Sequence, residues 1–504
     1  MGEDRLLLGL DIGTTHCKAA LFAEDGRLLR SAKANTRKYA ESGLEYYDPE
    51  RLWEDLAALI REAVPPEAAR RVAAVGVTSM AETGLLVDAE DGRARTPLIP
   101  WYSPCAKPQA ELVEADSDPL ERFAATGLRS SFKYGLAKLL WLKEKEPSAL
   151  ERAVWLSAAD YAAFRLTGAL ATDYTLAART YAFRIDRKEW DREWIGHFGL
   201  RPSLFPEAVP SGTAVGRVTK EAEAAAGLPA GVPVAIAGHD HVAASVAAGV
   251  VRPGTVMDSI GTAETLVGVL PERGLTERDF ASGLSFGLHP AEGRMFWMGG
   301  LSASGGSVEW FRSALSDASP GYEKISDLLS GLPLEEPSGI VYFPYLSGSG
   351  APLPDPDAKA AFLGLTARLG QADLLKAVLE GTAYEMESIR RAAERIAGMA
   401  IEQSVATGGG VRNRHWLQIK ANVSGRRIRV ADHPETALLG AAMLAGIGAG
   451  VYGNLEQAMT AAADRRSEDV VEPHAAAFEK YRRLYEEVYV PMQQPLRRYS
   501  KTII

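Results

Sequence analysis

A single carboxylate, Asp240, stands between two histidines, His239 and His241, at the end of an apolar run that begins at Val232. Small residues follow in a pattern that favours a helix. An aspartate in this place can cap the helix, because its carboxylate accepts hydrogen bonds from free backbone N–H groups. It can also act as a catalytic base at the carboxyl end of a buried strand. Taken alone, the stretch leaves both interpretations open.

The flanking histidines raise a third interpretation, a zinc site, since His-x-His can supply two ligands to the metal. No third ligand is evident nearby in the sequence, which argues against zinc. The two cysteines, Cys17 and Cys105, are too few for a cysteine-rich metal site or a disulfide framework.

Three glycine-rich stretches have the composition of phosphate-binding turns. Asp11-Ile-Gly-Thr-Thr15 links two strand-like runs, and Gly261-Thr262-Ala263 does the same about 250 residues later. Thr407-Gly408-Gly409-Gly410 follows an apolar strand and precedes a helix, whose N-terminus favours anions. Glycine permits close approach of the backbone to a ligand. Ordinary tight turns remain the alternative for each stretch.

Other residues have a functional and a structural interpretation of equal weight. The stretch Ser302–Ser307, just before Glu309, is either a serine-capped helix start or another turn that faces a nucleotide. Glu82 follows a strand-like run and can accept sugar hydroxyls or lie in a solvated loop. Trp101 can stack on a sugar face or pack in a core.

The elements that must position these residues alternate between strand-like and helix-like runs, which is typical of an α/β fold. The hairpin patterns of Arg5–Phe22 and Thr255–Leu270 match each other, so two domains of related design are predicted. Their tips are expected to face each other, with a boundary near Pro253-Gly254. The segment Ala149–Leu166 is predicted to be helical.

Composition excludes several classes of protein. The chain has 504 residues, a net charge of -9 and a pI of about 5.6, which argues against nucleic acid as the main partner. No apolar run reaches the roughly 18 to 20 residues of a membrane-spanning helix. The start of the chain lacks the pattern of a signal peptide. A soluble, cytoplasmic protein is therefore expected.

The whole chain resembles the FGGY family of carbohydrate kinases. The most specific stretch is Ala360-Ala-Phe362-Leu-Gly364-Leu365, followed after seven residues by Asp373-Leu374-Leu-Lys-Ala377-Val378-Leu379-Glu380. It is similar to the family's C-terminal signature in spacing and residue type. Gly238-His239-Asp240 lies where the family keeps its catalytic aspartate. The stretches Ala237-Gly-His-Asp240, Trp101-x-x-Pro104 and Ile419-Lys-Ala-Asn422 look most like L-fuculokinase, and the chain as a whole resembles the fuculokinase-like and xylulokinase-like members.

This resemblance implies a two-domain, actin-like or hexokinase-like ATPase fold of the α/β class, with duplicated ribonuclease H-like domains and a cleft between them. Residues 1–250 would form the sugar-binding domain with the catalytic base, and residues 251–504 the ATP-binding domain. The implied reaction is the ATP-dependent phosphorylation of a hydroxyl on a small sugar, such as a pentulose or a 6-deoxyhexulose, with Mg²⁺. A polyol kinase for glycerol or a tetritol is the alternative.

The resemblance also implies roles for individual residues. Asp240 would be the general base, and Asp11 and Asp240 would lie at the metal. The residues implied at the nucleotide are Gly13, Thr14, Thr15, Lys18, Gly261, Thr262, Gly305, Glu309, Gly409, Gly410 and Asn413. Those implied at the substrate are Glu82, Trp101, His239, Asp240 and His241. Family members are often dimers, so a homodimer is a further expectation.

Two departures from the family pattern fall near the substrate. The Lys138-Leu-Leu-Trp141 core of the family's first signature is present, but Lys133 and Gly135 do not fit the positions upstream of it. Many members have Trp-x-Asp-x-Arg, whereas this chain has Trp101-Tyr-Ser103-Pro-Cys105 and so lacks the acid and the arginine. Met80-Ala81-Glu82-Thr83 is close to the Arg-Glu-Thr of glycerol kinases, with alanine in place of arginine. The sequence therefore does not identify which sugar is the substrate. A non-catalytic ATP or sugar sensor on this fold, and an actin-like filament or chaperone ATPase, are the rival classes.

Overall fold

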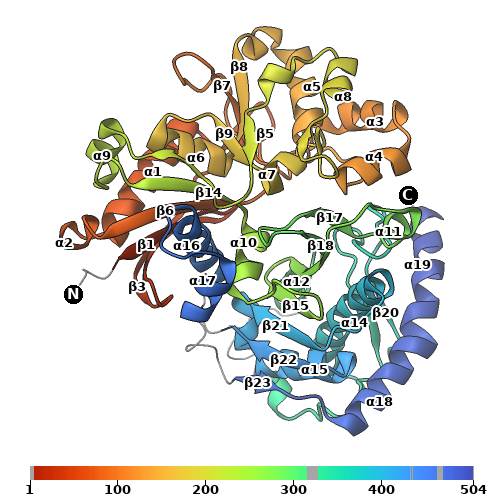
Figure 1. The fold of residues 1–504 in the computed structure, drawn as a ribbon. Coiled ribbons are helices and arrows are strands. Elements are labelled where there is room, and N and C mark those ends of the chain that lie inside the picture. Colours follow the sequence, from red (N-terminus) through yellow and green to blue (C-terminus); the bar gives the residue numbers. More distant parts are fainter. Residues whose placement is uncertain (1–4, 315–326, 432, 434, 463–468, 503–504) are drawn as a thin grey trace.

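The computed structural model describes residues 5–314, 327–431, 433, 435–462 and 469–502. The chain forms two halves, each built around a twisted sheet (Figure 1). The first sheet has the strand order β13-β14-β6-β1-β2-β3, and the second has the order β17-β18-β16-β15-β21-β22-β23. Helices and sheets alternate along the chain, which confirms the predicted α/β class.

The first sheet begins with the predicted hairpin. Strand β1 (Leu6–Ile12) pairs antiparallel with β2 (His16–Ala23) and parallel with β6 (Val72–Ser79). Nearly every residue of β1 is buried, because helices cover both faces of this part of the sheet. The carboxyl ends of β1, β6 and β14 (Pro233–His239) consequently lie at one edge.

The second sheet repeats this pairing pattern. Strands β15 (Thr255–Ile260) and β16 (Glu264–Pro271) form an antiparallel hairpin, and β15 runs parallel to β21 (Gln403–Thr407). Each half therefore contains the hairpin that the sequence predicted, and in each half its first strand also pairs in parallel with a later strand.

The prediction of a single helix over Ala149–Leu166 is wrong. It contains strand β8 (Ala153–Ser157), which pairs with β7 (Gly84–Asp88), and only then helix α6 (Ala158–Thr167). Every residue of β8 is buried, so its apolar run carried no alternation to mark it as a strand. The Ser157 hydroxyl accepts from the Asp160 N–H, and this capping box marks the true start of the helix.

Helix α16 (Thr436–Gly448) belongs to the second half of the chain but packs on the first sheet and on α10 (Asp240–Ala247) (Figure 1). Glycines allow this close approach. A Cβ on Gly76 would lie 2.0 Å from the Ala441 carbonyl oxygen, and one on Gly440 would lie 1.8 Å from that of Ala243. The two halves are thus joined through backbone contacts between α10 and α16.

The other elements support these two sheets. In the first half they are β3 (Leu28–Asn35), β4 (Tyr39–Glu41), β5 (Leu44–Tyr46), α1 (Pro49–Ala63), α2 (Pro66–Ala69), α3 (Lys107–Ala115), α4 (Pro119–Thr126), α5 (Gly135–Lys145), β9 (Ala171–Asp173), α7 (Tyr174–Ala178), β10 (Phe183–Arg184), β11 (Glu189–Trp190), α8 (Arg192–His197), β12 (Glu207–Val209), β13 (Ala214–Arg217) and α9 (Lys220–Ala226).

In the second half they are α11 (Glu277–Ala281), β17 (Ser285–Leu288), β18 (Arg294–Leu301), α12 (Gly305–Ala314), β19 (Val341–Phe343), β20 (Ala361–Leu363), α14 (Gln371–Ala397), α15 (Arg414–Ser424), β22 (Arg427–Val430), α17 (Leu455–Ala461), β23 (Val470–Val471), α18 (Ala475–Leu484), a π-helical turn (Tyr485–Tyr489) and α19 (Val490–Thr502). In the described part of the chain, none of these helices combines the length and the apolar character that a bilayer crossing requires.

Candidate active site

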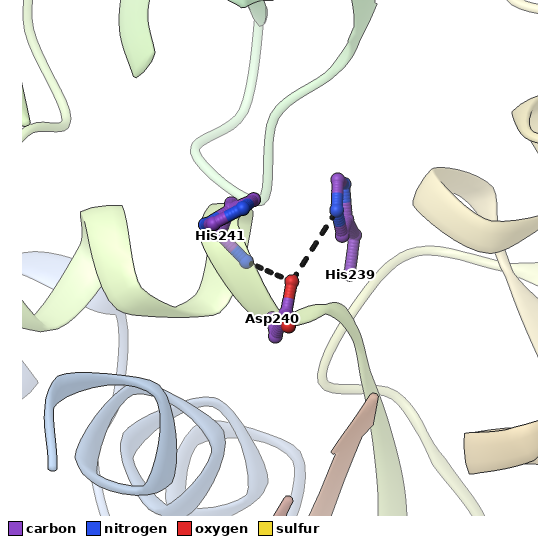
Figure 2. A group of neighbouring side chains, drawn as sticks. All are labelled: His239, Asp240 and His241. Atoms are coloured by element: carbon purple, nitrogen blue, oxygen red, sulfur yellow. Dashed lines mark hydrogen bonds and ion pairs between the residues drawn. The ribbon is translucent and has the colours of Figure 1, made fainter. Parts of the chain in front are cut away.

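Asp240 is the first residue of α10 and follows β14 directly. The N-cap residue is His239, whose side chain makes no capping hydrogen bond, so Asp240 lies one position inside the helix. The Asp240 Oδ1 atom accepts from the His241 backbone N–H at 2.7 Å and lies 3.3 Å from His239 Nε2 (Figure 2). A quarter of the Asp240 side chain stays exposed, which leaves the carboxylate accessible to a reactant.

The junction before Asp240 is held in place by a buried polar network. Gly238 has a φ of +84°, and a Cβ there would lie 2.1 Å from Thr175 Oγ1, so the position requires glycine. The His239 backbone N–H donates to that threonine hydroxyl at 2.9 Å, and the hydroxyl itself donates to Asp173. The Thr78 hydroxyl donates to the Gly238 carbonyl at 2.6 Å. These contacts fix the direction in which the Asp240 side chain leaves the backbone.

Two carboxyl groups share the end of the first sheet. Burial raises the pKa of Asp240, and the charge of Glu82 raises it further, whereas His241 lowers it. Burial also raises the pKa of Asp11 to about 8, with a further contribution from Asp240 and an opposing one from Lys18. Both groups therefore hold protons more tightly than exposed aspartates, as expected of groups at reactive sites.

The first hairpin tip lies beside these carboxyl groups. Its turn is closed by the Gly13 N–H, which donates to the His16 carbonyl at 3.0 Å. The Thr14 hydroxyl accepts from the indole N–H of Trp101 at 2.9 Å, so this tip and the predicted sugar-stacking residue are in contact. Thr15 is exposed at the end of the turn. Among the predicted nucleotide residues, Lys18 is instead held by Glu435 at 2.6 Å.

Glu82 has partners that the sequence analysis did not identify. Its carboxylate accepts from the Arg179 guanidinium Nε at 2.6 Å, and its backbone carbonyl accepts from Lys138 Nζ at 2.6 Å. Burial lowers the pKa of Lys138 to about 7. Arg179 Nη1 is buried and has no hydrogen-bond partner among the residues described. The guanidinium beside Glu82 thus comes from Arg179 at the end of α7, 97 residues away along the chain, a distance that motif matching cannot bridge.

Trp101 has a second neighbour, Lys133, which the sequence did not indicate. Lys133 Nζ lies 5.1 Å from the centre of the indole ring, and burial lowers the pKa of this lysine. The Trp101 backbone N–H donates to the Thr83 hydroxyl at 3.1 Å. Trp101 is therefore a partly exposed ring fixed at several points, and it is not a core residue.

The second hairpin tip is joined to the start of α12. The backbone N–H of Gly305 donates to the Gly261 carbonyl at 3.0 Å, and that of Gly306 donates to the Thr262 carbonyl at 2.9 Å. A Cβ on Gly305 would lie 2.4 Å from the Gly261 oxygen, which explains the glycine. Glu309 lies one turn further along α12, half exposed, and forms an ion pair with Arg312.

A buried ionic cluster, which the sequence analysis missed, lies beneath this tip. Lys420 from α15 contacts Glu264 and also lies 3.4 Å from Asp258, while Ser304 donates to Glu264. Burial raises the pKa of Asp258 well above its usual value, and Glu264 adds to this effect. Asp258 therefore holds its proton more tightly than an exposed aspartate, and Lys420 lies within ion-pair distance of both carboxyl groups.

The triple-glycine turn lies beside the second tip. A Cβ on Gly410 would lie 2.2 Å from the side chain of Ile260, the residue that precedes Gly261. Gly409 has open space around it. Asn413 caps α15, because its side-chain oxygen accepts from the Trp416 N–H at 3.1 Å. The second tip, the α12 start and the glycine turn thus converge, as do Asp11, Thr14, Glu82, Trp101 and Asp240 in the first half.

Family models match most of the chain. Residues 6–247 match the model of the N-terminal domain of the FGGY family of carbohydrate kinases, and residues 257–449 match that of the C-terminal domain. The chain belongs to the FGGY family of carbohydrate kinases. It is therefore a phosphotransferase, and the sensor, filament and chaperone alternatives are set aside.

Named relatives in this FGGY family cover almost the entire chain. A xylulose kinase of Bacillus subtilis is 27% identical over 491 residues, covering 95% of this chain and 97% of its own. A glycerol kinase of Citrifermentans bemidjiense is 31% identical over 482 residues, covering 92% and 94%. The crystal structure of a xylulose kinase from Rhodospirillum rubrum superposes with a TM-score of 0.87 at 26% identity, covering 99% and 100%. The predicted two-domain kinase fold is thereby confirmed.

Proposed function

We propose that this kinase transfers the γ-phosphoryl group of ATP to a hydroxyl of a small sugar, with Asp240 as the general base. The observation that carries this proposal is the placement of Asp240. Its partly exposed carboxylate interacts electrostatically with Glu82, the predicted sugar ligand, and with Asp11 beside the first glycine tip. In this proposal residues 1–250 bind the acceptor and residues 251–504 bind ATP.

In the proposed reaction the acceptor hydroxyl oxygen attacks the γ-phosphorus of ATP. The new P–O bond forms as the bond from the γ-phosphorus to the β,γ-bridging oxygen breaks, and ADP leaves. The hydroxyl proton passes to the Asp240 carboxylate, whose raised pKa makes it a stronger base than an exposed aspartate. Phosphoryl transfer depends mainly on positioning and on electrostatic stabilisation, which the glycine tips would supply through their backbone N–H groups.

The residues near Asp240 fit a magnesium ion. Asp11 Oδ1 is buried and lacks a hydrogen-bond partner among the described residues, and Mg²⁺ prefers carboxylate oxygens together with water. We propose that Asp11 and Asp240 hold the ion, which when bound would neutralise charge on the phosphates. The remaining nucleotide contacts proposed are Gly13, Thr14, Thr15, Lys18, Gly261, Thr262, Gly305, Glu309, Gly409, Gly410 and Asn413.

For the acceptor we propose a ketose, such as a pentulose or a 6-deoxyhexulose, held by Glu82, Trp101, His239 and His241. The B. subtilis and R. rubrum relatives named xylulose kinases support this choice. A polyol such as glycerol or a tetritol is the second candidate, because Ala81-Glu82-Thr83 is close to the glycerol kinase motif and one relative carries that name. Since ATP is the donor, we propose that the enzyme works in the cytoplasm.

The proposal is tested by following ADP release from the full chain with ATP, Mg²⁺ and a panel of pentuloses, 6-deoxyhexuloses, glycerol and tetritols. One acceptor should stimulate release, and Asp240→Asn should lower its kcat by about 10²- to 10⁴-fold, the usual contribution of a general base. Asp116→Asn is the control, because Asp116 is an exposed aspartate that pairs with His197 on the surface. A rate for Asp240→Asn within tenfold of wild type would reject Asp240 as the base.

A further inference from the structure

We propose that His239, Asp240 and His241 together form a binding site for a divalent transition metal such as Zn²⁺, which inhibits the kinase by occupying its base. One ligand atom from each residue lies within 4.8 Å of the others (Figure 2). The inhibitory consequence rests on the proposed role of Asp240, whereas the metal site itself does not. The sequence indicated two histidine ligands, and in the structure the carboxylate between them is close enough to be the third.

Three consecutive side chains converge here because the backbone changes conformation between them. Successive side chains alternate across a strand and are spread around a helix, so neither element brings neighbours together. His239 has extended backbone angles at the end of β14, whereas Asp240 and His241 belong to the first turn of α10. The change from strand to helix turns all three toward the same space, and the two imidazole rings lie 5.4 Å apart.

The distances approach those of a tetrahedral site. Bonds of about 2.0 to 2.1 Å from zinc to nitrogen and oxygen place two ligand atoms roughly 3.3 to 3.4 Å apart. His239 Nε2 and Asp240 Oδ1 are already 3.3 Å apart. The third atom, on His241, has to move by an amount on the order of 1 Å, and its half-exposed ring can do so by side-chain rotation.

The ligand types select the metal. Imidazole suits zinc, copper and nickel, whereas magnesium prefers oxygen ligands and retains water. Three protein ligands leave a fourth position open, which is the pattern of accessible zinc sites. His239 Nδ1 is buried without a hydrogen-bond partner among the described residues, so the usual outer support of a metal-bound histidine is missing. Moderate affinity is therefore expected.

Direct binding is measured by titrating the full chain with Zn²⁺ by calorimetry and with Co²⁺ by visible absorption, without nucleotide. One ion per chain should bind, with an affinity lowered by the missing outer partner of His239. His239→Gln and His241→Gln should each weaken binding by at least about tenfold. His197→Gln is the matched control, because His197 also contacts an aspartate, Asp116, at 2.8 Å but is exposed and isolated.

Activity supplies the second readout. With Mg²⁺ in large excess, micromolar Zn²⁺ should inhibit the wild type and the His197→Gln variant equally, and a chelator should restore the rate. Absence of one-to-one binding in an active enzyme overturns the metal site and leaves the proposed function intact. Tight binding that persists in both His239→Gln and His241→Gln likewise rejects this site. An enzyme that binds zinc but turns over no acceptor rejects the proposed function instead.

Discussion

Lys420 on α15 forms a buried ion pair with Glu264, the first residue of β16, which directly follows the Gly261-Thr262-Ala263 tip. The side chain of Lys420 is 5% exposed and that of Glu264 is fully buried. Asn413, the N-cap of α15, closes the turn that contains Gly409 and Gly410, so one lysine joins the two segments proposed to hold ATP. We expect their relative position to depend on this pair.

Replacing Lys420 with methionine should therefore weaken ATP binding. The change leaves Glu264 buried without its partner, and losing half of a buried pair typically destabilises a protein by about 3 to 5 kcal/mol. We expect the KM for ATP to rise at least about tenfold while the KM of the acceptor changes little. Steady-state kinetics with each substrate varied, together with thermal unfolding, measures both effects.

Lys376→Met is the matched control for that experiment. Lys376 on α14 is also buried, lies 3.8 Å from Glu380 and donates to the Pro333 carbonyl, and neither partner belongs to a tip. This variant should lose stability without any change in the KM for ATP. An equal rise in the KM for ATP in both variants would mean that the Lys420 pair acts through general stability.

Trp101→Phe should lower the efficiency with which the acceptor is used. The substitution keeps an aromatic face but removes the indole N–H that donates to Thr14 at 2.9 Å. A hydrogen bond of this kind is worth about 0.5 to 1.5 kcal/mol, so kcat/KM should fall roughly 3- to 10-fold. Trp101→Leu, which also removes the ring face, should cause a larger loss. Equal losses in the two variants would show that the hydrogen bond alone matters.

The stability of the protein should depend on the protonation of Asp160. Burial raises the pKa of this carboxyl to about 7, although the Ser157 backbone N–H opposes the shift. The folded state thus binds more protons than the unfolded state between about pH 4 and pH 7, so the free energy of unfolding falls as pH rises through this window. In the Asp160→Asn variant, the free energy of unfolding should fall less as pH rises. Urea unfolding at several pH values measures this difference. An unchanged pH dependence would contradict the raised pKa.

Gly440→Ala should disrupt the contact between α10 and α16. A Cβ at this position would lie 1.8 Å from the Ala243 carbonyl oxygen, and overpacking costs about 1 to 3 kcal/mol. The melting temperature should fall by several degrees, and activity should fall with it, since Ala243 is three residues from Asp240. Gly196→Ala, at a helical glycine with open space around it, should be neutral or slightly stabilising.

Local pattern sufficed to predict the strands and turns that carry the site. The hairpins around Gly13 and Gly261 were predicted because strand-like runs flank a glycine-containing turn, a signal contained within about 20 residues. The strand β8 was missed, because a short run buried on both faces looks like part of a helix. The true helix start at Ser157 was available in the sequence as a capping pattern.

Side chains that reach the site from distant segments could not be predicted in the same way. Arg179 contacts Glu82, which is 97 residues away in the sequence, and Lys420 contacts Glu264, which is 156 residues away. Neither pair has a local signature, because the partners are brought together by the folding of whole elements. One hint was available in the sequence: Lys420 lies among mostly apolar residues of α15, and a buried lysine requires a partner.

The position of α16 has a consequence for synthesis of the chain. The ribosome makes β1, β6 and α10 long before it reaches Thr436, so the face of the first sheet that receives α16 stays uncovered until nearly nine-tenths of the polypeptide exists. An isolated fragment that ends near residue 250 would keep that apolar face open to water and to other chains. The first half of the nascent protein therefore cannot complete its fold before the second half has been synthesised.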